Sequence, residues 1–196
     1  MQISEIESIL TKKYRDCICS LSKASIDDSS GENIPLCSSQ MDCYNYDKIV
    51  EKNFVGKDFI CSVDAIIIGC EYINFIEFKN GCISSQVKKN IRNKIMEGMY
   101  YFERFILQGK MMSCSKIHTR FILVYNPEKC VTDKKKNRDY INSTILDKAN
   151  QVNEKRFIND RYDKDWHIFD EAISLPVSVF QERLDEFVNK IKIDTI

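Results

Sequence analysis

The spacing of hydrophobic and polar residues divides the first part of the chain into two helices and a loop. Residues 3–22 carry apolar side chains every three to four positions, which predicts an amphipathic helix. The polar stretch that follows contains Gly31 and Pro35 and is typical of a loop. The helical spacing returns over residues 44–54, and Gly56 marks the end of this second predicted helix.

The pattern becomes strand-like after Asp58. The stretch FICSVDAIII, residues 59–68, is rich in β-branched residues and is followed by Gly69. The stretch YINFIEFKN, residues 72–80, alternates between the two faces that a strand presents. We expect these two stretches to form a β-hairpin that turns at Gly69–Glu71.

A long helix and a buried strand follow the predicted hairpin. An apolar stripe runs through residues 84–108, and Gly109 stands where this helix is expected to end. The stretch RFILVYN, residues 120–126, has the composition of a buried strand. For the rest of the chain the pattern predicts a helix over 140–153, a short strand over 166–169 and a helix over 177–193.

The order of these elements indicates an α/β fold. A hairpin, a long helix and a further strand suit a central mixed β-sheet flanked by helices, with extra helices at the N- and C-terminal ends. The chain has no internal repeat, no low-complexity tract and no linker-like segment. We therefore expect residues 1–196 to form a single domain.

Composition narrows the class of protein further. The 196 residues are 43% hydrophobic and 30% charged, as in ordinary globular proteins. No apolar run approaches the roughly 20 residues of a membrane helix, and the N-terminal residues lack the pattern of a secretion signal. We expect a cytoplasmic protein that does not bind membranes.

The cysteines do not form a recognisable zinc site. The chain has nine of them without a CxxC pair, and its two histidines have no cysteines at zinc-finger spacing. An odd number of cysteines in a cytoplasmic chain indicates reduced thiols, several of them buried as small apolar side chains.

The charges are unevenly distributed although the net charge is zero. Residues 1–78 hold 7 Lys and Arg against 13 Asp and Glu, residues 79–138 hold 14 against 4, and residues 139–196 hold 8 against 12. The positive central block is typical of a segment that binds a polyanion. Mutual neutralisation of surface charges in the folded molecule is the alternative interpretation.

Three charged residues interrupt the apolar stretch of the predicted hairpin. Glu77 and Lys79 project from the same side of their strand because strand side chains alternate. A turn at Gly69–Glu71 sets Asp64 opposite Glu77. The hairpin therefore predicts that two carboxylates and one amine meet on one face of the sheet. A solvated strand end with a surface Glu77–Lys79 pair is the alternative.

This group of side chains suits phosphodiester hydrolysis. Two carboxylates are hard oxygen ligands of the kind that Mg²⁺ or Mn²⁺ prefers. We predict Asp64 and Glu77 as metal ligands, with the main-chain carbonyl of Phe78 as a further ligand oxygen. Lys79 would position or deprotonate the attacking water, or neutralise developing charge.

The sequence VD-x12-E-F-K resembles the PD-(D/E)xK nuclease superfamily, whose members have the restriction-endonuclease-like fold. The matching residues are Asp64, Glu77 and Lys79, and Val63 replaces the proline that is frequent in the family. The resemblance covers about residues 42–126. It implies a divalent-metal-dependent nuclease that acts on nucleic acid. The alternative is a catalytically inactive relative that serves as a protein- or nucleic-acid-binding regulatory module.

The resemblance also implies supporting residues on two helices. Family members often add a carboxylate from the helix before the first motif strand. Glu51 is the candidate here, with Asp47 one turn away as an alternative and Glu7 on the first predicted helix as a remoter one. Some relatives use a polar residue on the helix after the second motif strand, a place that Gln86 fills. The Gln-x-x-x-Tyr spacing of one nuclease branch is absent because position 90 is asparagine.

Basic residues of the long predicted helix are the candidates for nucleic-acid binding. Phosphate contacts are expected from Lys88, Lys89, Arg92 and Lys94. The loop 134–138 is also basic, and a solvated surface is the alternative interpretation of both segments. A second copy of the chain or another protein is the alternative kind of partner.

Overall fold

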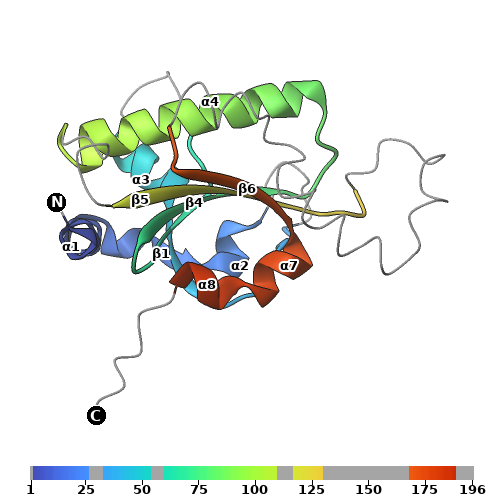
Figure 1. The fold of residues 1–196 in the computed structure, drawn as a ribbon, viewed down its shortest axis with the longest axis horizontal. Helices are drawn as coiled ribbons and strands as arrows, with labels where there is room; N and C mark the ends of the chain where they lie inside the picture. Colours follow the sequence, from blue (N-terminus) through green and yellow to red (C-terminus); the bar gives the residue numbers. More distant parts are fainter. Residues whose placement is uncertain (1, 27–32, 54–59, 110–116, 130–167, 189–196) are drawn as a thin grey trace, which may run out of the picture.

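A six-stranded mixed β-sheet with helices on both faces forms the centre of the protein (Figure 1). The structure is a computed structural model, and it describes residues 2–26, 33–53, 60–109, 117–129 and 168–188. The predicted α/β class with a mixed sheet is confirmed. Among the residues that the structure describes, no helix has the length and apolar character of a membrane-spanning segment.

The strands lie in the sheet in the order in which they occur along the chain. The pairs from β1 to β4 are antiparallel, whereas β4 pairs parallel with β5 and β5 pairs parallel with β6. They are β1 (Ile18–Ser20), β2 (Asp42–Asn45), β3 (Ala65–Ile68), β4 (Tyr72–Lys79), β5 (His118–Tyr125) and β6 (Glu171–Pro176).

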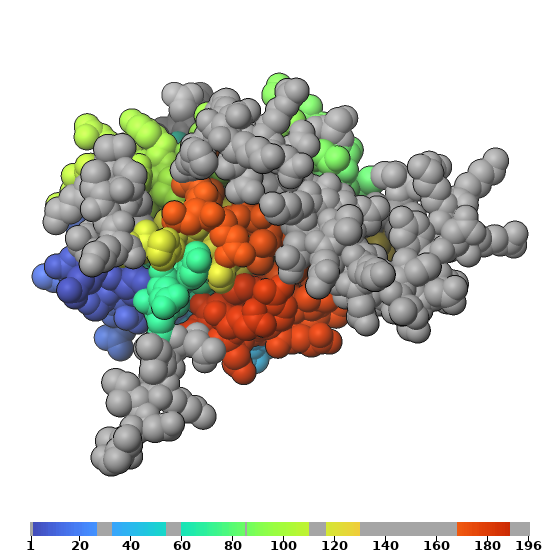
Figure 2. All heavy atoms as spheres, in the orientation of Figure 1, coloured from blue at the N-terminus to red at the C-terminus, as the bar shows by residue number. Residues whose placement is uncertain are grey.

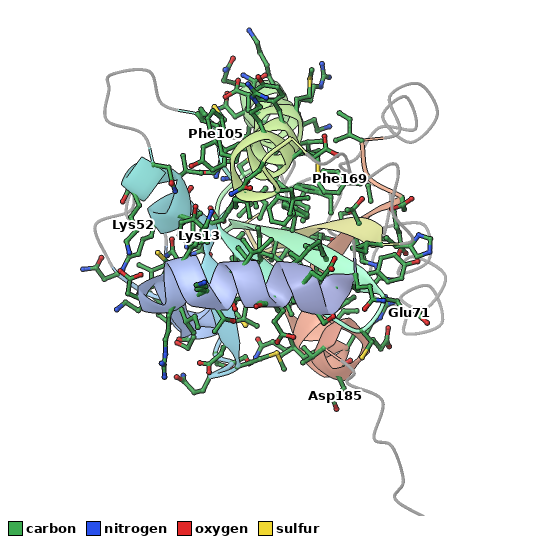
Figure 3. The ribbon with its side chains drawn as sticks, turned by 90° about the vertical axis from the view of Figure 1, so that its left-hand side faces the viewer. Lys13, Lys52, Glu71, Phe105, Phe169 and Asp185 are labelled. Atoms are coloured by element: carbon green, nitrogen blue, oxygen red, sulfur yellow. The ribbon has the colours of Figure 1, made fainter. Side chains whose placement is uncertain are left out.

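Helices cover the sheet in two layers (Figures 1 and 3). One layer contains α1 (Ile3–Tyr14), α3 (Tyr46–Asn53) and α4 (Ser85–Tyr101). The opposite layer contains α2 (Leu21–Ala24), α7 (Val177–Glu182) and α8 (Leu184–Val188). Each face of the sheet therefore has its own hydrophobic core.

Alternation along β4 sorts its side chains between these two cores. Ile73 and Phe75 are buried against the layer that contains α4. Ile76 and Phe78 are buried on the other face, where the Phe78 ring packs edge-on against Phe180 of α7. Glu77 shares its face with Phe75, so the charge enters the core beneath α4.

Helix α4 forms where the apolar stripe predicts it. The Ser84 side chain accepts a hydrogen bond from the Val87 N–H and caps the first turn. Ile91 and Ile95 are buried against the sheet. A π-helical segment, Phe102–Ile106, follows α4, and the chain leaves it at Gly109, whose φ of 79° is the left-handed conformation that favours glycine.

The prediction of one helix over residues 3–22 is wrong at its C-terminal end. Helix α1 ends at Tyr14, and a 3-10 turn, Arg15–Cys17, leads into β1. Strand β1 pairs antiparallel with β2, a strand that the sequence pattern did not predict. Both strands have four residues or fewer, and their hydrogen bonds come from distant parts of the chain, so local periodicity does not reveal them.

The strand predicted over residues 59–68 is shorter in the structure and starts at Ala65. Before it, the backbone is held by helix side chains instead of a strand partner. The Cys61 N–H donates to Glu97 of α4, 2.7 Å away, and the Ser62 hydroxyl donates to Asp47 of α3. The predicted turn is confirmed, since the Gly69 N–H bonds the Tyr72 carbonyl at 2.9 Å.

The C-terminal prediction is wrong in detail. Residues 168–170 form a bend, and the strand is β6, which starts only after Asp170 accepts a hydrogen bond from the Thr119 N–H at 2.6 Å. The final helix is interrupted at Arg183, between α7 and α8. The predicted helix 140–153, residues 166–167 and residues 189–193 lie outside the described residues.

Candidate active site

The register of the β3–β4 hairpin sets the two predicted carboxylates opposite each other. The antiparallel ladder ends with the pair Ala65–Ile76, so Asp64, directly before Ala65, faces Glu77, directly after Ile76. The Phe78 N–H donates to the Asp64 carboxylate at 2.6 Å, which fixes Asp64 just beyond the end of β3. The hairpin thus brings the two carboxylates to one face of the sheet.

Two ammonium groups contact these carboxylates. Lys79 Nζ lies 2.6 Å from Glu77 Oε1. Lys94 Nζ, from α4, lies 2.9 Å from Glu77 Oε2 and 3.2 Å from Asp64 Oδ1. Lys94 therefore bridges the two carboxylates from the α4 side of the sheet. Lys79 contacts the Glu77 carboxylate and not that of Asp64.

Burial differs sharply within this group of four. The Glu77 side chain is 0% exposed, whereas Asp64, Lys94 and Lys79 are 18%, 21% and 28% exposed. Oε1 of Glu77 has no hydrogen-bond donor among the described residues, because its close contact with Lys79 is an ion pair without hydrogen-bond geometry. The Lys79 charge therefore compensates this buried oxygen electrostatically.

The environment raises the pKa of Glu77 to about 7. Burial is the main cause, the charge of Asp64 adds to it, and the ammonium groups of Lys94 and Lys79 oppose it. Burial alone would lower the pKa of Lys94, but the charges of Glu77 and Asp64 outweigh it and raise that pKa above its ordinary value. Lys94 is therefore charged near neutral pH.

Asp47 joins the edge of this group from α3. Its carboxylate accepts a hydrogen bond from Ser62, and burial, reinforced by the charge of Asp64, raises its pKa to about 6. The Tyr46 N–H donates to the Asp64 carbonyl at 3.1 Å, which holds the start of α3 against the site. Glu51, the favoured helix carboxylate in the sequence prediction, is exposed one turn further along.

Helices α3 and α4 are tied together over the site. The buried Tyr46 hydroxyl donates to the Gly98 carbonyl of α4 at 2.7 Å. Glu97, the preceding residue, accepts the Cys61 N–H three residues before Asp64. These contacts fix the height of α4 above the sheet, and with it the reach of the Lys94 side chain.

The side chains of Gln86 and Phe78, two further predicted site residues, both point away from the carboxylates. Gln86 is exposed and donates to Asn90 at 3.1 Å. Gln86, Asn90 and Lys94 follow each other at intervals of four, so Gln86 lies two turns, or about 12 Å, along α4 from Lys94. The Phe78 side chain points into the opposite core, and the metal-binding role of its carbonyl stays a prediction.

The predicted phosphate-binding residues fall into two groups. Lys88, Lys89 and Arg92 are exposed along α4. Lys94 instead turns toward the carboxylates. The basic loop 134–138 lies outside the described residues.

A divalent cation at this site would rely on few protein ligands. Within the described ranges, no group of three or more His, Cys, Asp and Glu side chains is placed to hold a metal ion. Mg²⁺ is commonly bound through one or two carboxylates, with water and substrate phosphates as the other ligands. Asp64 and Glu77 supply two carboxylates, and in the structure the ammonium groups of Lys79 and Lys94 contact them.

The chain matches no protein-family model, no curated protein and no solved structure. We therefore infer function from the geometry of Asp64, Glu77, Lys79 and Lys94.

Sequence reasoning identified the hairpin residues but missed the place of Lys94. The available clue is its position in α4, because Lys94 stands three residues after Ile91 and directly before Ile95, both of which are buried. A lysine at that point of an apolar stripe is directed toward the sheet. Asp47 was the second choice because nothing in the sequence shows that Ser62 reaches it.

Proposed function

We propose that the protein is a divalent-metal-dependent nuclease that hydrolyses phosphodiester bonds in nucleic acid. The observation that carries the proposal is the meeting of Asp64 and Glu77 on one sheet face, with Lys79 in contact with Glu77. The α/β sheet in which β4, α4 and the parallel β5 follow each other is compatible with the restriction-endonuclease-like fold.

Asp64 and Glu77 are the residues that would hold Mg²⁺ or Mn²⁺. The bound cation would supply electrostatic stabilisation for charge that develops on a phosphodiester. The chain prepares this position in two ways. The Phe78 N–H orients the Asp64 carboxylate, and the apolar surroundings of Glu77 exclude water and strengthen its interaction with a cation.

Lys79 is the residue best placed to act on the substrate. Its side chain is the most exposed of the four and contacts Glu77 at the end of β4. From there it can donate a hydrogen bond to a phosphate oxygen or orient a water molecule for attack. Lys88, Lys89 and Arg92, exposed on the neighbouring α4, would hold the phosphates of the nucleic-acid backbone.

Cleavage assays test this function. Plasmid DNA, single-stranded DNA and RNA are incubated with Mg²⁺ or Mn²⁺ and with wild type, Asp64→Asn, Glu77→Gln or Lys79→Met. We expect each substitution to lower the cleavage rate by about 100-fold or more, because each removes a ligand or an acid–base group. Asp185→Asn is the matched control, since Asp185 is exposed on α8, on the far side of the sheet (Figure 3).

Two results would overturn the nuclease proposal. One is the absence of cleavage by the wild-type protein on all three substrates with both metals. The other is cleavage that persists at the wild-type rate in Asp64→Asn and Glu77→Gln, which would place the activity elsewhere or in a contaminant.

A non-catalytic binding module is the second candidate function. It is favoured by Lys94, whose ammonium group contacts both carboxylates from within the chain, so the fold has a counter-ion without any metal. A protein of this kind would bind nucleic acid or a protein partner with the same affinity in Mg²⁺ and in EDTA, and would cleave nothing. Binding measured by fluorescence anisotropy under both conditions distinguishes it from the nuclease.

A further inference from the structure

The ammonium group of Lys94 lies where a cation shared by the two carboxylates would be bound. It contacts one oxygen of Glu77 at 2.9 Å and one oxygen of Asp64 at 3.2 Å. One oxygen belongs to Glu77 of β4 and the other to Asp64, which directly precedes β3, the strand that pairs with β4. A positive group between two carboxylates reduces the repulsion between their negative charges, as a metal ion bound by both would.

The formal charges around Lys94 distinguish two arrangements. Asp47, Asp64 and Glu77 contribute three negative charges, and Lys79 and Lys94 contribute two positive charges, so the sum is −1. A divalent cation added beside both lysines brings the sum to +1, whereas the same cation in place of Lys94 brings it to zero. Repulsion between like charges in a largely buried site therefore favours replacement over addition.

The surroundings of Lys94 allow its side chain to leave without movement of the helix. Helix α4 is fixed to neighbouring elements by the Tyr46–Gly98 and Cys61–Glu97 hydrogen bonds. The Lys94 side chain is 21% exposed, so part of its path already reaches solvent. A lysine side chain is a flexible four-carbon stem, and rotation about its bonds moves the ammonium group by several ångströms.

We propose that Lys94 is a built-in counter-ion that a divalent cation displaces from Asp64 and Glu77, so that Lys94 sets the metal affinity of the site. This role rests on the proposed function, because it concerns the same two carboxylates. It makes Lys94 a positioning residue: in the absence of metal it holds the two carboxylates together, and on metal binding it gives up these contacts.

Calorimetric titration with Mn²⁺ in the absence of nucleic acid tests the displacement. Lys94→Met removes the competing charge and retains the length of the side chain. We expect it to bind Mn²⁺ at least about tenfold more tightly than wild type, because the cation no longer replaces an ammonium group. Lys13→Met is the matched control for loss of one positive charge, since Lys13 is exposed on α1, and it should bind Mn²⁺ as wild type does.

The outcomes separate this proposal from the nuclease proposal. Equal Mn²⁺ affinity in wild type and Lys94→Met overturns the role of Lys94 and leaves the nuclease proposal standing. Tighter binding by Lys94→Met, together with the absence of cleavage by wild type, supports the role of Lys94 and overturns the nuclease proposal. Absence of Mn²⁺ binding to every variant overturns the role of Lys94, and the cleavage assays then decide the nuclease proposal, because substrate phosphates can supply the missing metal ligands.

A second variant keeps the test decisive if Lys94→Met does not fold. Lys94→Arg retains the positive charge and can pair with both carboxylates through its planar guanidinium group. We expect this variant to bind Mn²⁺ no more tightly than wild type. Tighter binding by Lys94→Arg would overturn the displacement, because the competing charge is still present in that variant.

Discussion

At the scale of single residues, the most unusual feature is a fully buried glutamate in contact with two lysines. Burial disfavours the charged form of Glu77, and the lysines compensate only in part, so its pKa rises from 4.5 to about 7. The folded protein therefore keeps a proton on Glu77 at pH values where the unfolded chain has released it. Retention of that proton makes stability depend on pH.

The sign of this dependence follows from proton binding. Between pH 4.5 and about pH 7 the folded state binds one proton more than the unfolded state at Glu77, so stability falls as the pH rises through this range. Lys94 does not titrate in this range, because its pKa lies above its ordinary value of 10.5. Asp47 acts in the same direction as Glu77 over the range from 3.8 to about 6.

We predict that Glu77→Gln makes stability less dependent on pH. In buffer with EDTA, the wild-type free energy of unfolding should fall between pH 5 and pH 7, and the substitution should remove roughly 2 kcal/mol of that fall. Urea unfolding at a series of pH values measures it. Asp185→Asn should keep the wild-type slope, and an unchanged slope in Glu77→Gln would contradict the raised pKa.

The residue scale also shows what sequence can and cannot predict about the site. Asp64, Glu77 and Lys79 were predictable because charges in apolar strands are rare and strand alternation is regular. The sequence predicts Lys94 as a phosphate-binding residue, because a lysine near Arg92 on an amphipathic helix is usually exposed to solvent. The rotation of α4 relative to the sheet decides its role, and tertiary contacts set that rotation.

At the scale of elements, the β3–β4 hairpin carries the site on one side and supports α8 on the other. Asn74 of β4 is buried and donates to the Phe187 carbonyl of α8 at 3.0 Å. The guanidinium of Arg120 stacks over the Tyr72 ring, 4.0 Å from its centre. In Figure 2 the red C-terminal helices accordingly lie beside the blue-green hairpin.

Gly69 allows α8 to come this close to the hairpin. A Cβ atom at this position would lie 2.7 Å from the Phe187 carbonyl oxygen and 3.2 Å from the Tyr72 carbonyl oxygen. Because both neighbours are backbone atoms, the clash could be relieved only by moving α8 or the turn.

We predict that Gly69→Ala destabilises the protein by about 1–3 kcal/mol, the range for an extra carbon in a tightly packed site. Urea unfolding followed by circular dichroism measures the change. Gly81→Ala is the matched control, since a Cβ there has no atom within 4 Å, and it should unfold like wild type. A loss as large in Gly81→Ala would show that the contact with α8 is not the cause.

The elements themselves were predictable in proportion to their length. Helix α4 and strands β4 and β5 have enough residues for their periodicity to stand out. Strands β1 and β2 do not, and they form because β2 finds backbone partners in both β1 and β3. Strand β6 was expected too early, since the hydrogen bond between Asp170 and Thr119 sets where it begins, and that contact spans 51 residues of chain.

At the scale of the whole molecule, one sheet separates two hydrophobic cores. Phe75 belongs to the core beneath α4, and Phe180 belongs to the core beneath α7 and α8. Both cores pack against the same sheet, so loss of packing in one core exposes one face of that sheet to water and weakens the support of the other core. We therefore expect the two cores to unfold together, although they share no side chains.

We predict that Phe75→Leu and Phe180→Leu each lower the free energy of unfolding by roughly 1–3 kcal/mol, because each leaves a space in a buried core. The double variant should lose the sum, since the two side chains lie on opposite faces of the sheet. Far-UV circular dichroism during urea unfolding should show one transition in every variant. Two separate transitions in either single variant would contradict the shared dependence on the sheet.

The position of the candidate site depends on the number of residues in the β3–β4 hairpin. Twelve residues separate Asp64 from Glu77, and with the turn at Gly69 this number sets them opposite each other. A slip of one residue would set Asp64 opposite Ile76 or Phe78 and carry its charge toward the wrong core, at a high cost in stability. Replacement of the exposed Cys70 or Glu71 should therefore be tolerated, whereas an insertion or deletion that shifts the β3–β4 ladder should cost fold and site together.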